Sequence, residues 1–236
     1  MTAATPAPTV LVVLAHPDDP EFFCGGTLAL WAEQGSRISY CLLTRGDKGD
    51  ENGSDPGGLA ARREAEQRAA AGVLGVAEVN FLDHPDGYLI PDLDLRREVV
   101  RAIRRVRPSV VVTCDPTNFF PNDRYINHPD HRAAGQVTLD AVFPAAGSRM
   151  FFPELLEEGL EPHKVSQVYV AMPQTSNTVI DVTTMFERKV EALRRHASQI
   201  ADPEALVLRL KDRMIDPTSP PESPRYVERF RRIDLG

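Results

Sequence analysis

Residues 10–15 have the sequence VLVVLA and lead directly into His16-Pro17-Asp18-Asp19. A continuous apolar run of this length is typical of a strand that is covered on both faces, as in a parallel sheet. A helical pattern follows at residues 23–34 and ends at Gly35, a residue that commonly stops helices. The segment therefore predicts the first half of a βαβ unit, with polar side chains placed where the first strand ends.

The alternation of short apolar runs with longer helical patterns continues along the chain. Further strands are predicted at residues 38–43, 79–82, 110–113, 165–171 and, at an edge, 178–182. Helices are predicted at residues 59–74, 93–106, 184–199 and from Pro129 to about residue 142. Because alternating strands and helices form right-handed βαβ units, we predict a Rossmann-like α/β fold in a single domain, with a mainly parallel sheet flanked by helices.

Two parts of the chain depart from this pattern. Residues 45–58 are rich in glycine and aspartate and are expected to form a loop. From Ala201 onward the sequence is polar and interrupted by prolines, so we expect short helices and a tail that lies on the surface. The expected organisation is a main domain at residues 1–200 and an extension at 201–236 that packs on it. The loop and the tail are expected to control access to a site.

The composition is that of an ordinary globular chain. Hydrophobic residues make up 42% and charged residues 26% of the 236 positions, which excludes wholesale disorder. No apolar run approaches the ~18 residues of a membrane helix, and a net charge of −7 argues against binding to nucleic acid. Cys24, Cys41 and Cys114 are too few and too far apart for a disulfide framework, and the first ten residues lack the features of a secretory signal. We therefore expect reduced thiols in a cytoplasmic protein.

Two segments with the same residue pattern stand where a parallel sheet places its functional sites, beyond the carboxyl ends of the strands. His16-Pro17-Asp18-Asp19 follows the first strand, and His128-Pro129-Asp130-His131 opens the helix after the fourth strand. The tripeptide His-Pro-Asp occurs a third time at residues 84–86, whereas the composition predicts about 0.04 occurrences by chance. The repetition marks these segments as candidates for function.

The residue types in the two segments are those of a metal centre. Histidine and aspartate are good ligands for a borderline divalent ion such as zinc. His16 and Asp19 are three residues apart in a turn, so both can face one point. His128 and His131 are three residues apart on one face of a helix. Two histidines, one carboxylate and an open position are typical of catalytic zinc, and the spare carboxylate of Asp18 could accept a proton from the bound water.

Other interpretations of these residues remain open at this point. Asp19 or Asp130 could cap a helix. The same ligand set could hold iron in an oxygenase, although such sites usually lie in all-β barrels. His84 is better explained by the turn sequence that follows it, whereas Asp86 follows the third strand and could reach the site.

The two remaining histidines are expected to be structural. His163 is interpreted as a loop residue and His196 as a residue on the surface of a helix.

The segment AHPDDPEFFCGGTLA at residues 15–29, together with HPDHRAAG at residues 128–135, resembles the LmbE-like, or PIG-L, family of zinc-dependent de-N-acetylases. These enzymes act on compounds that contain N-acetylglucosamine. The resemblance extends over about residues 10–200. Softer matches occur at Thr44-Arg45-Gly46, Arg63 with Glu66, Leu74-Gly75, Phe81-Leu82, Pro85-Asp86-Gly87, Asp181-Val182-Thr183, Lys189, Ala192-Leu193, His196 and Ser198-Gln199.

The resemblance assigns a role to each residue that matches the family pattern. His16, Asp19 and His131 match the zinc ligands, and Asp18 matches the general base. His128 matches a residue that stabilises the oxyanion or acts as an acid, with Asp130 orienting it.

The resemblance also implies a substrate-binding pair and one departure from the family. Arg63 and Asp86 fall where relatives contact the sugar. Some relatives carry a tyrosine two residues before His128; here that position is Ile126, with Tyr125 next to it. Whether Tyr125 or His128 serves as the general acid stays open.

The sequence thus predicts a zinc-dependent N-deacetylase that removes the acetyl group from a small-molecule N-acetylglucosamine conjugate, with Fe²⁺ as an alternative metal in the cell. An amidase acting on a larger sugar or thiol conjugate is one alternative. A non-catalytic, metal-containing binding protein is another, from a different class. The resemblance is also compatible with a homo-oligomer, because relatives range from monomers to hexamers.

Overall fold

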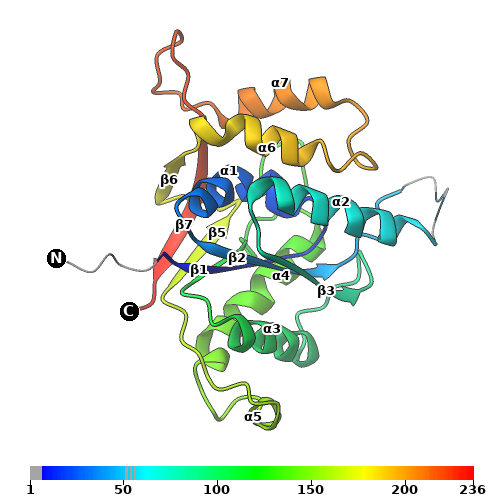
Figure 1. The fold of residues 1–236 in the computed structure, drawn as a ribbon, viewed down its shortest axis with the longest axis vertical. Helices are drawn as coiled ribbons and strands as arrows, with labels where there is room; N and C mark the ends of the chain where they lie inside the picture. The colour runs from blue at the N-terminus through cyan, green and yellow to red at the C-terminus, as the bar shows by residue number, and fades with distance from the viewer. Residues whose placement is uncertain (1–6, 51–52, 54, 56) are drawn as a thin grey trace.

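A seven-stranded sheet crosses the centre of the computed structural model, which describes residues 7–50, 53, 55 and 57–236 (Figure 1). Its strands lie in the order β3-β2-β1-β4-β5-β7-β6. Their bounds are β1 (Thr9–Leu14), β2 (Arg37–Thr44), β3 (Glu78–His84), β4 (Val110–Cys114), β5 (Gln167–Ala171), β6 (Thr178–Asp181) and β7 (Val227–Asp234). Strands β1 to β5 are parallel, whereas β7 runs antiparallel to both of its neighbours.

Helices cover both faces of this sheet (Figure 1). One face carries α1 (Asp19–Glu33), α2 (Leu59–Leu74), the short 3₁₀ helix η2 (Thr183–Met185), α6 (Phe186–Leu193) and, outermost, α7 (Pro203–Met214). The other carries α3 (Leu93–Val106), α4 (Pro129–Asp140), the π-helix η1 (Ala141–Ala146) and α5 (Glu154–Glu157). The arrangement confirms the predicted α/β fold.

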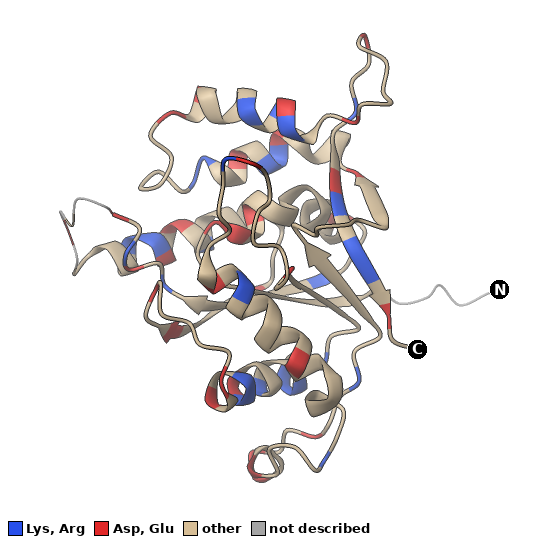
Figure 2. Cartoon of the chain, turned by 180° about the vertical axis from the view of Figure 1, so that it is seen from behind, with Lys and Arg blue, Asp and Glu red and all other residues tan. Residues whose placement is uncertain are grey.

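The central strand β1 explains why residues 10–15 are apolar at every position. Leu11 and Val13 point into the core that lies under α3 and α4. Val10, Val12 and Leu14 point into the opposite core, under α1. Figure 2 accordingly shows the charged residues mainly along the helices, the loops and β7, and few on the central strands.

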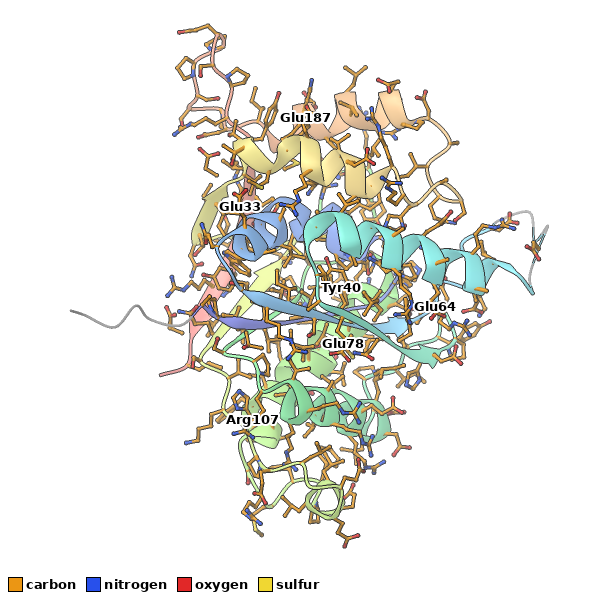
Figure 3. The ribbon with its side chains drawn as sticks, viewed as in Figure 1. Glu33, Tyr40, Glu64, Glu78, Arg107 and Glu187 are labelled. Atoms are coloured by element: carbon orange, nitrogen blue, oxygen red, sulfur yellow. The ribbon has the colours of Figure 1, made fainter. Side chains whose placement is uncertain are left out.

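Polar groups are also drawn into the layer between the sheet and the helices. Tyr40 of β2 lies within this layer, fully buried, whereas the labelled Glu33, Glu64 and Glu187 lie on helices (Figure 3). The Tyr40 hydroxyl donates a hydrogen bond to Glu21 of α1, 3.4 Å away. A third apolar cluster joins α1, α2, α6 and α7, so α7 packs on the same body as the rest of the chain.

Most predicted elements are confirmed, and some bounds differ. The predicted helices at residues 59–74 and 93–106 coincide with α2 and α3. Helix α1 begins at Asp19, four residues before the predicted start, because Pro20 is well suited to a first helical turn. The helix predicted at residues 184–199 is shorter, since it starts as η2 and ends at Leu193.

The prediction of a surface-lying tail was wrong for residues 227–234. They form β7, which pairs with β5 on one side and with β6 on the other. Its alternation is imperfect, because Glu228 is buried next to the buried Val227. The buried Glu228 interrupts the alternation of apolar and polar residues that would have indicated a strand. The division of the chain at residue 200 stays a prediction.

Three further expectations concern membranes, thiols and termini. Among the described residues, none of the helices combines the length and apolar character that crossing a bilayer requires. Cys24, Cys41 and Cys114 are buried free thiols, as predicted. Residues 1–6, on which the expectation about a secretory signal partly rests, and positions 51, 52, 54 and 56 of the predicted loop lie outside the described residues.

A buried ion pair ties β7 to helix α1. Lys189 Nζ of α6 lies 2.7 Å from Glu228 Oε1, with both side chains at most 3% exposed. The Glu228 carboxylate also accepts hydrogen bonds from the backbone N–H groups of Gly26 and Thr27, at 3.0 and 2.8 Å. Lys189 donates a further bond to the carbonyl of Phe22, at 2.8 Å. The last strand and α6 therefore hold the helix that begins at Asp19.

Removing one partner of this pair should destabilise the fold strongly. Glu228→Gln leaves the Lys189 ammonium buried without its counter-ion, which costs about 3–5 kcal/mol of unfolding free energy. Denaturation in urea measures the loss. The matched control is Glu191→Gln, which breaks the exposed pair with Arg195 and should cost about 0.3–0.5 kcal/mol. Equal effects of the two substitutions would contradict a stabilising role for the buried pair.

Candidate active site

The predicted site residues gather where the strand order reverses. From β1 the chain crosses to β2 on one side, whereas β4 lies on the other side of β1. Such a switch point leaves a crevice at the carboxyl ends of the strands. His16, Asp18 and Asp19 follow β1 directly, and His128 and His131 stand at the start of α4. The topology thus brings together two segments that are more than 100 residues apart.

Three side chains bring their donor atoms together as a metal centre requires. His16 Nδ1 lies 3.3 Å from His131 Nε2 and 3.5 Å from Asp19 Oδ2. His131 Nε2 lies 3.1 Å from Asp19 Oδ1. Zinc with tetrahedral bonds of about 2.1 Å separates its ligand atoms by about 3.4 Å. The predicted ligands therefore have separations that fit such an ion.

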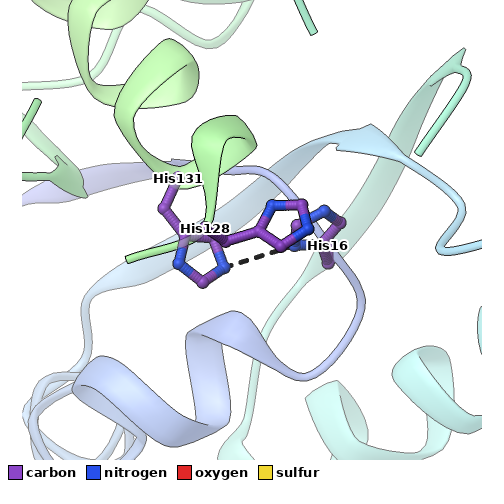
Figure 4. A group of neighbouring side chains, drawn as sticks. All are labelled: His16, His128 and His131. Carbon is purple, nitrogen blue, oxygen red and sulfur yellow. Dashed lines mark hydrogen bonds between the residues drawn. The ribbon is translucent and has the colours of Figure 1, made fainter. Parts of the chain in front are cut away.

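His128 stands close to the same point. Its ring nitrogens, with those of His16 and His131, form a group whose donor atoms lie within 4.8 Å of one another. Figure 4 shows the three rings together, His128 and His131 from the start of α4 and His16 from the loop after β1, with the contact between His16 and His131 dashed. His16 also forms a group of this kind with Asp86 and Asp130. A His/Asp group able to hold a metal ion is thus present.

In each predicted histidine ligand, the ring nitrogen that faces away from the converging donor atoms contacts an oxygen atom. His131 Nδ1 lies 2.9 Å from Asn127 Oδ1. His16 Nε2 lies 3.0 Å from Asp86 Oδ1 and 3.3 Å from Asp130 Oδ2. An oxygen partner on one ring nitrogen fixes the tautomer and directs the other nitrogen toward a metal. Both rings therefore present the correct nitrogen to the group.

The surrounding charges favour a cation at this place. Burial lowers the pKa of His16, but the carboxylates of Asp130, Asp19 and Asp86 outweigh it and raise that pKa well above its usual range. Burial raises the pKa of Asp19, but His131 and His16 outweigh it and hold the carboxyl ionised. Asp19 also accepts a hydrogen bond from the backbone N–H of His16 at 2.9 Å. It does not cap α1, whose N-cap residue is Asp18.

Asp18 stands beside this group and has a different environment. Burial raises the pKa of its carboxyl to about 6, against the opposing effect of the Arg63 guanidinium. Arg63 Nη2 lies 3.2 Å from Asp18 Oδ2 and donates a 2.7 Å bond to the carbonyl of Pro17. Arg63 Nη1 donates to the carbonyl of Gly46 at 3.0 Å. Arg63, predicted to contact the sugar, is thus 4% exposed and bound mainly to protein groups.

The role predicted for Asp130, orienting His128, stays a prediction, and the Asp130 carboxylate lies against other groups. Its carboxylate contacts His16 and accepts hydrogen bonds from the backbone N–H groups of Gly87 and Leu89, at 2.7 and 3.2 Å. Only its backbone N–H meets His128, at Nδ1, 3.2 Å away. Sequence spacing could not reveal this, because the loop after β3 supplies the other partners. Since Nδ1 of His128 accepts a bond, its neutral ring carries the proton on Nε2.

The group opens into a cavity of about 1190 Å³. Seven of the eight predicted site residues line it, and the exception is Asp130, which is fully buried. The loop after β2 contributes Lys48 and Gly49, and α7 contributes charged side chains, so both predicted access segments reach the cavity. Other lining residues are Phe22, Phe23, Gly87, Pro121, Asn122, Asp123, Arg124, Tyr125, Met172, Arg209, Asp212 and Arg213.

Several polar residues around the site were not predicted from the sequence. His196, predicted on a helix surface, is fully buried, because the chain turns after α6 and brings its Nε2 to 3.2 Å from Glu21 Oε2. Gln67 and Glu21 are buried behind Asp18, and Asn127 holds His131. Only the helical spacing of Arg63 and Gln67, four residues apart on α2, could have indicated one of them. His163 lies in a loop, as predicted.

Comparison with known proteins identifies the family. The sequence pattern of the PIG-L family, described as GlcNAc-PI de-N-acetylase, matches residues 11–142, more than half of the chain. The chain belongs to the PIG-L family. The match spans both His-Pro-Asp segments of the site.

Individual deacetylases resemble most of the chain. Diacetylchitobiose deacetylase of Thermococcus kodakarensis is 36% identical over 194 residues, which cover 82% of this chain and 70% of that protein. The 1D-myo-inositol 2-acetamido-2-deoxy-alpha-D-glucopyranoside deacetylase of Acidothermus cellulolyticus is 32% identical, over 82% and 80%. The structure of N,N'-diacetylchitobiose deacetylase from Pyrococcus horikoshii superimposes with a TM-score of 0.81 and 26% identity, over 96% and 84%. The fold is thus shared with a solved deacetylase, and the relatives are deacetylases by their names.

Metal binding by this PIG-L protein should depend on His131 and on the residue that holds it. His131→Ala removes a donor atom, so we expect the metal content to fall from stoichiometric to a small fraction. Asn127→Ala leaves the ring unheld and should weaken metal affinity about 10–100-fold. Elemental analysis after dialysis and competition with a chelating dye measure the two effects. The control is His163→Ala, whose ring bonds to the carbonyl of Pro108; full metal content in His131→Ala would contradict the assignment.

Proposed function

We propose that this protein is a zinc-dependent N-deacetylase that removes the acetyl group from an N-acetylglucosamine conjugate. The observation that carries the proposal is the division of labour between Asp18 and Asp19. Asp19 is ionised and bound to both histidines of the converging group. Asp18, next in the chain, stays outside that group with a raised pKa and lines the cavity. This is the arrangement that a ligand and a separate base require.

Zinc fits the donor set, and we propose His16, Asp19 and His131 as its ligands. Two imidazoles and one carboxylate are ligands that zinc prefers, and an open fourth position is typical of catalytic sites. When bound there, zinc would acidify a water molecule and polarise the acetyl carbonyl. Iron would fit the same ligands, so the metal used in the cell is part of the test.

Asp18 is proposed as the general base. A carboxyl with a pKa of about 6 is mostly ionised at neutral pH and still basic enough to take a proton. Its Oδ atoms remove a proton from the water that attacks the acetyl carbon. The protonated carboxyl then gives a proton to the amine that leaves. Acetate and a free amino sugar are the products.

His128 is proposed to stabilise the oxyanion, as a neutral ring. Burial and the neighbouring His16 and His131 lower its pKa below the usual range, which disfavours the imidazolium form. The tautomer set by the backbone N–H of Asp130 leaves an Nε2–H to donate. A donor aimed at the developing negative charge is worth more in a site from which water is excluded. Tyr125 also lines the cavity, and it and His128 are the alternatives to Asp18 as the acid.

The cavity supports a substrate larger than one sugar. Its volume exceeds the usual 300–1000 Å³ of small-molecule sites. The relatives above act on diacetylchitobiose and on an N-acetylglucosaminyl inositol, by their names. We propose a small acetamido-sugar conjugate, with Asp86 accepting bonds from its hydroxyls and Arg63 near the sugar as the base's partner.

Two further properties belong to this proposal. Three buried free thiols support the predicted cytoplasmic location. A homo-oligomer is retained as a hypothesis, which light scattering of the purified protein tests.

Release of acetate is the experiment that tests the proposal. Zinc-loaded protein, offered a panel of N-acetylglucosaminyl conjugates, should release acetate from at least one member, and chelator-treated protein should not. Activity that persists without oxygen excludes an oxygenase. Asp18→Ala should lower kcat at least about 100-fold while zinc content is retained. Unchanged turnover in that variant would remove Asp18 as the base.

Two outcomes would favour the alternatives. Hydrolysis of larger amides, but of no acetamide, would indicate an amidase acting on a larger conjugate. No hydrolysis of any amide by a fully metallated protein would indicate a binding protein.

The pH dependence of turnover should respond to Arg63. The Arg63 cation favours ionised Asp18, so Arg63→Met raises the pKa of that carboxyl and the base form appears only at higher pH. In the plot of kcat against pH, the acid limb should move to higher pH by on the order of one unit. Activity should therefore fall more at pH 6 than at pH 8. Arg63→Lys, which keeps the charge, is the control and should shift the limb less. A limb that stays in place in Arg63→Met would contradict this coupling.

A further inference from the structure

We propose that Gln67, whose orientation is set by Glu21, is a positioning residue that frees the Asp18 carboxylate from capping helix α1. The inference rests on the proposed function, since it concerns the base of that reaction. Neither residue lines the cavity, and both side chains are fully buried.

The backbone of Asp18 has an unusual conformation. Its φ of 86° and ψ of −29° place it in the left-handed region, which is unfavourable for a residue with a side chain. Such conformations persist where the surrounding structure enforces them, and they concentrate at functional sites. Something must therefore hold Asp18 in place.

The conformation matters because Asp18 occupies the N-cap of α1. An aspartate at this position normally adopts an extended backbone, and its carboxylate accepts a bond from the second or third helical N–H. Pro20 has no N–H, so the ordinary partner here would be the N–H of Glu21. Asp18 makes no such bond. Its carboxylate instead meets Arg63 and lines the cavity.

Gln67 of α2 makes the contact that holds this conformation. Its Oε1 accepts a hydrogen bond from the backbone N–H of Asp18, at 2.8 Å. Gln67 is 0% exposed, so the bond is shielded from water. A buried backbone N–H that loses its acceptor destabilises a fold by about as much as a left-handed backbone does, so this bond can offset the strain at Asp18.

Glu21 determines which way the Gln67 amide faces. Gln67 Nε2 lies 3.0 Å from each of the Glu21 carboxylate oxygens, so the amide nitrogen faces Glu21 and the amide oxygen faces Asp18. Glu21 is held in turn by His196 Nε2 at 3.2 Å and by the Tyr40 hydroxyl at 3.4 Å. The clamp, defined as Glu21 and Gln67, is therefore anchored by buried groups from β2 and from the turn after α6.

Gln67→Leu tests the clamp, because leucine has a similar size and neither donates nor accepts. We expect kcat to fall about 100-fold, as a base misplaced by about 1 Å does, with KM nearly unchanged. Zinc content should be retained. The crystal structure of the variant should show Asp18 with negative φ and its carboxylate bonded to the N–H of Glu21.

Exchanging the two side chains provides a rescue. Gln67→Glu alone sets two carboxylates against each other and should lose activity. Gln67→Glu combined with Glu21→Gln restores one acceptor for Asp18 and one donor between the pair, so it should regain most of the lost kcat. Gln167→Leu is the matched control, because that amide bonds to Asp234, outside the cavity, and kcat should not change.

Two results would overturn the clamp, namely an unchanged kcat in Gln67→Leu or an unchanged left-handed Asp18 in its crystal structure. Failure of the proposed function looks different, since wild-type protein would then release no acetate from any conjugate. In that case the φ of Asp18 in Gln67→Leu still decides the matter. A relaxed φ supports the clamp, and a retained φ contradicts it.

Discussion

Several charged side chains are buried together at one edge of the sheet, beyond the carboxyl ends of β1 and β3. The carboxylates of Asp19, Asp86 and Asp130 surround the ring of His16, and each is less than 10% exposed. Carboxylates this close to one another are tolerated only with positive charge and hydrogen-bond donors among them. The donors here are two imidazoles and the backbone N–H groups after β3. A cation bound among the carboxylates would add to the positive charge. The site thus has the charge distribution of a group that can hold a metal ion.

The start of helix α1 shows how the same chemistry is divided between neighbours. Asp18 and Asp19 are adjacent and identical in type, yet one has a raised pKa and the other a lowered one. The difference comes from what each carboxylate faces. Asp19 meets two imidazoles, whereas Asp18 is partly buried beside a single guanidinium. The backbone of Asp18 is left-handed, and its carboxylate lies against Arg63, outside the group that Asp19 joins. The buried Gln67 amide on α2 accepts a hydrogen bond from the Asp18 N–H.

The C-terminal part contributes to the site from a distance. Strand β7 enters the sheet between β5 and β6, and its Glu228 binds backbone N–H groups of α1. The same part carries α7, whose charged side chains line the far wall of the cavity. Residues beyond the family match therefore both hold the helix that begins at Asp19 and line the cavity.

The fold class and the chemistry were readable in the sequence, because they depend on local pattern. Apolar strands of the right length, helix periods and the repeated His-Pro-Asp segments are determined by neighbouring residues, and they located the sheet, the switch point and the groups that converge there. The partners of those groups were not readable. Asp130 holding His16, Arg63 bound to Asp18, His196 buried against Glu21 and the strand at residues 227–234 all depend on contacts between segments far apart in the chain. Only the tertiary structure decides them, since a buried polar group takes whichever partner the packing brings within hydrogen-bonding distance.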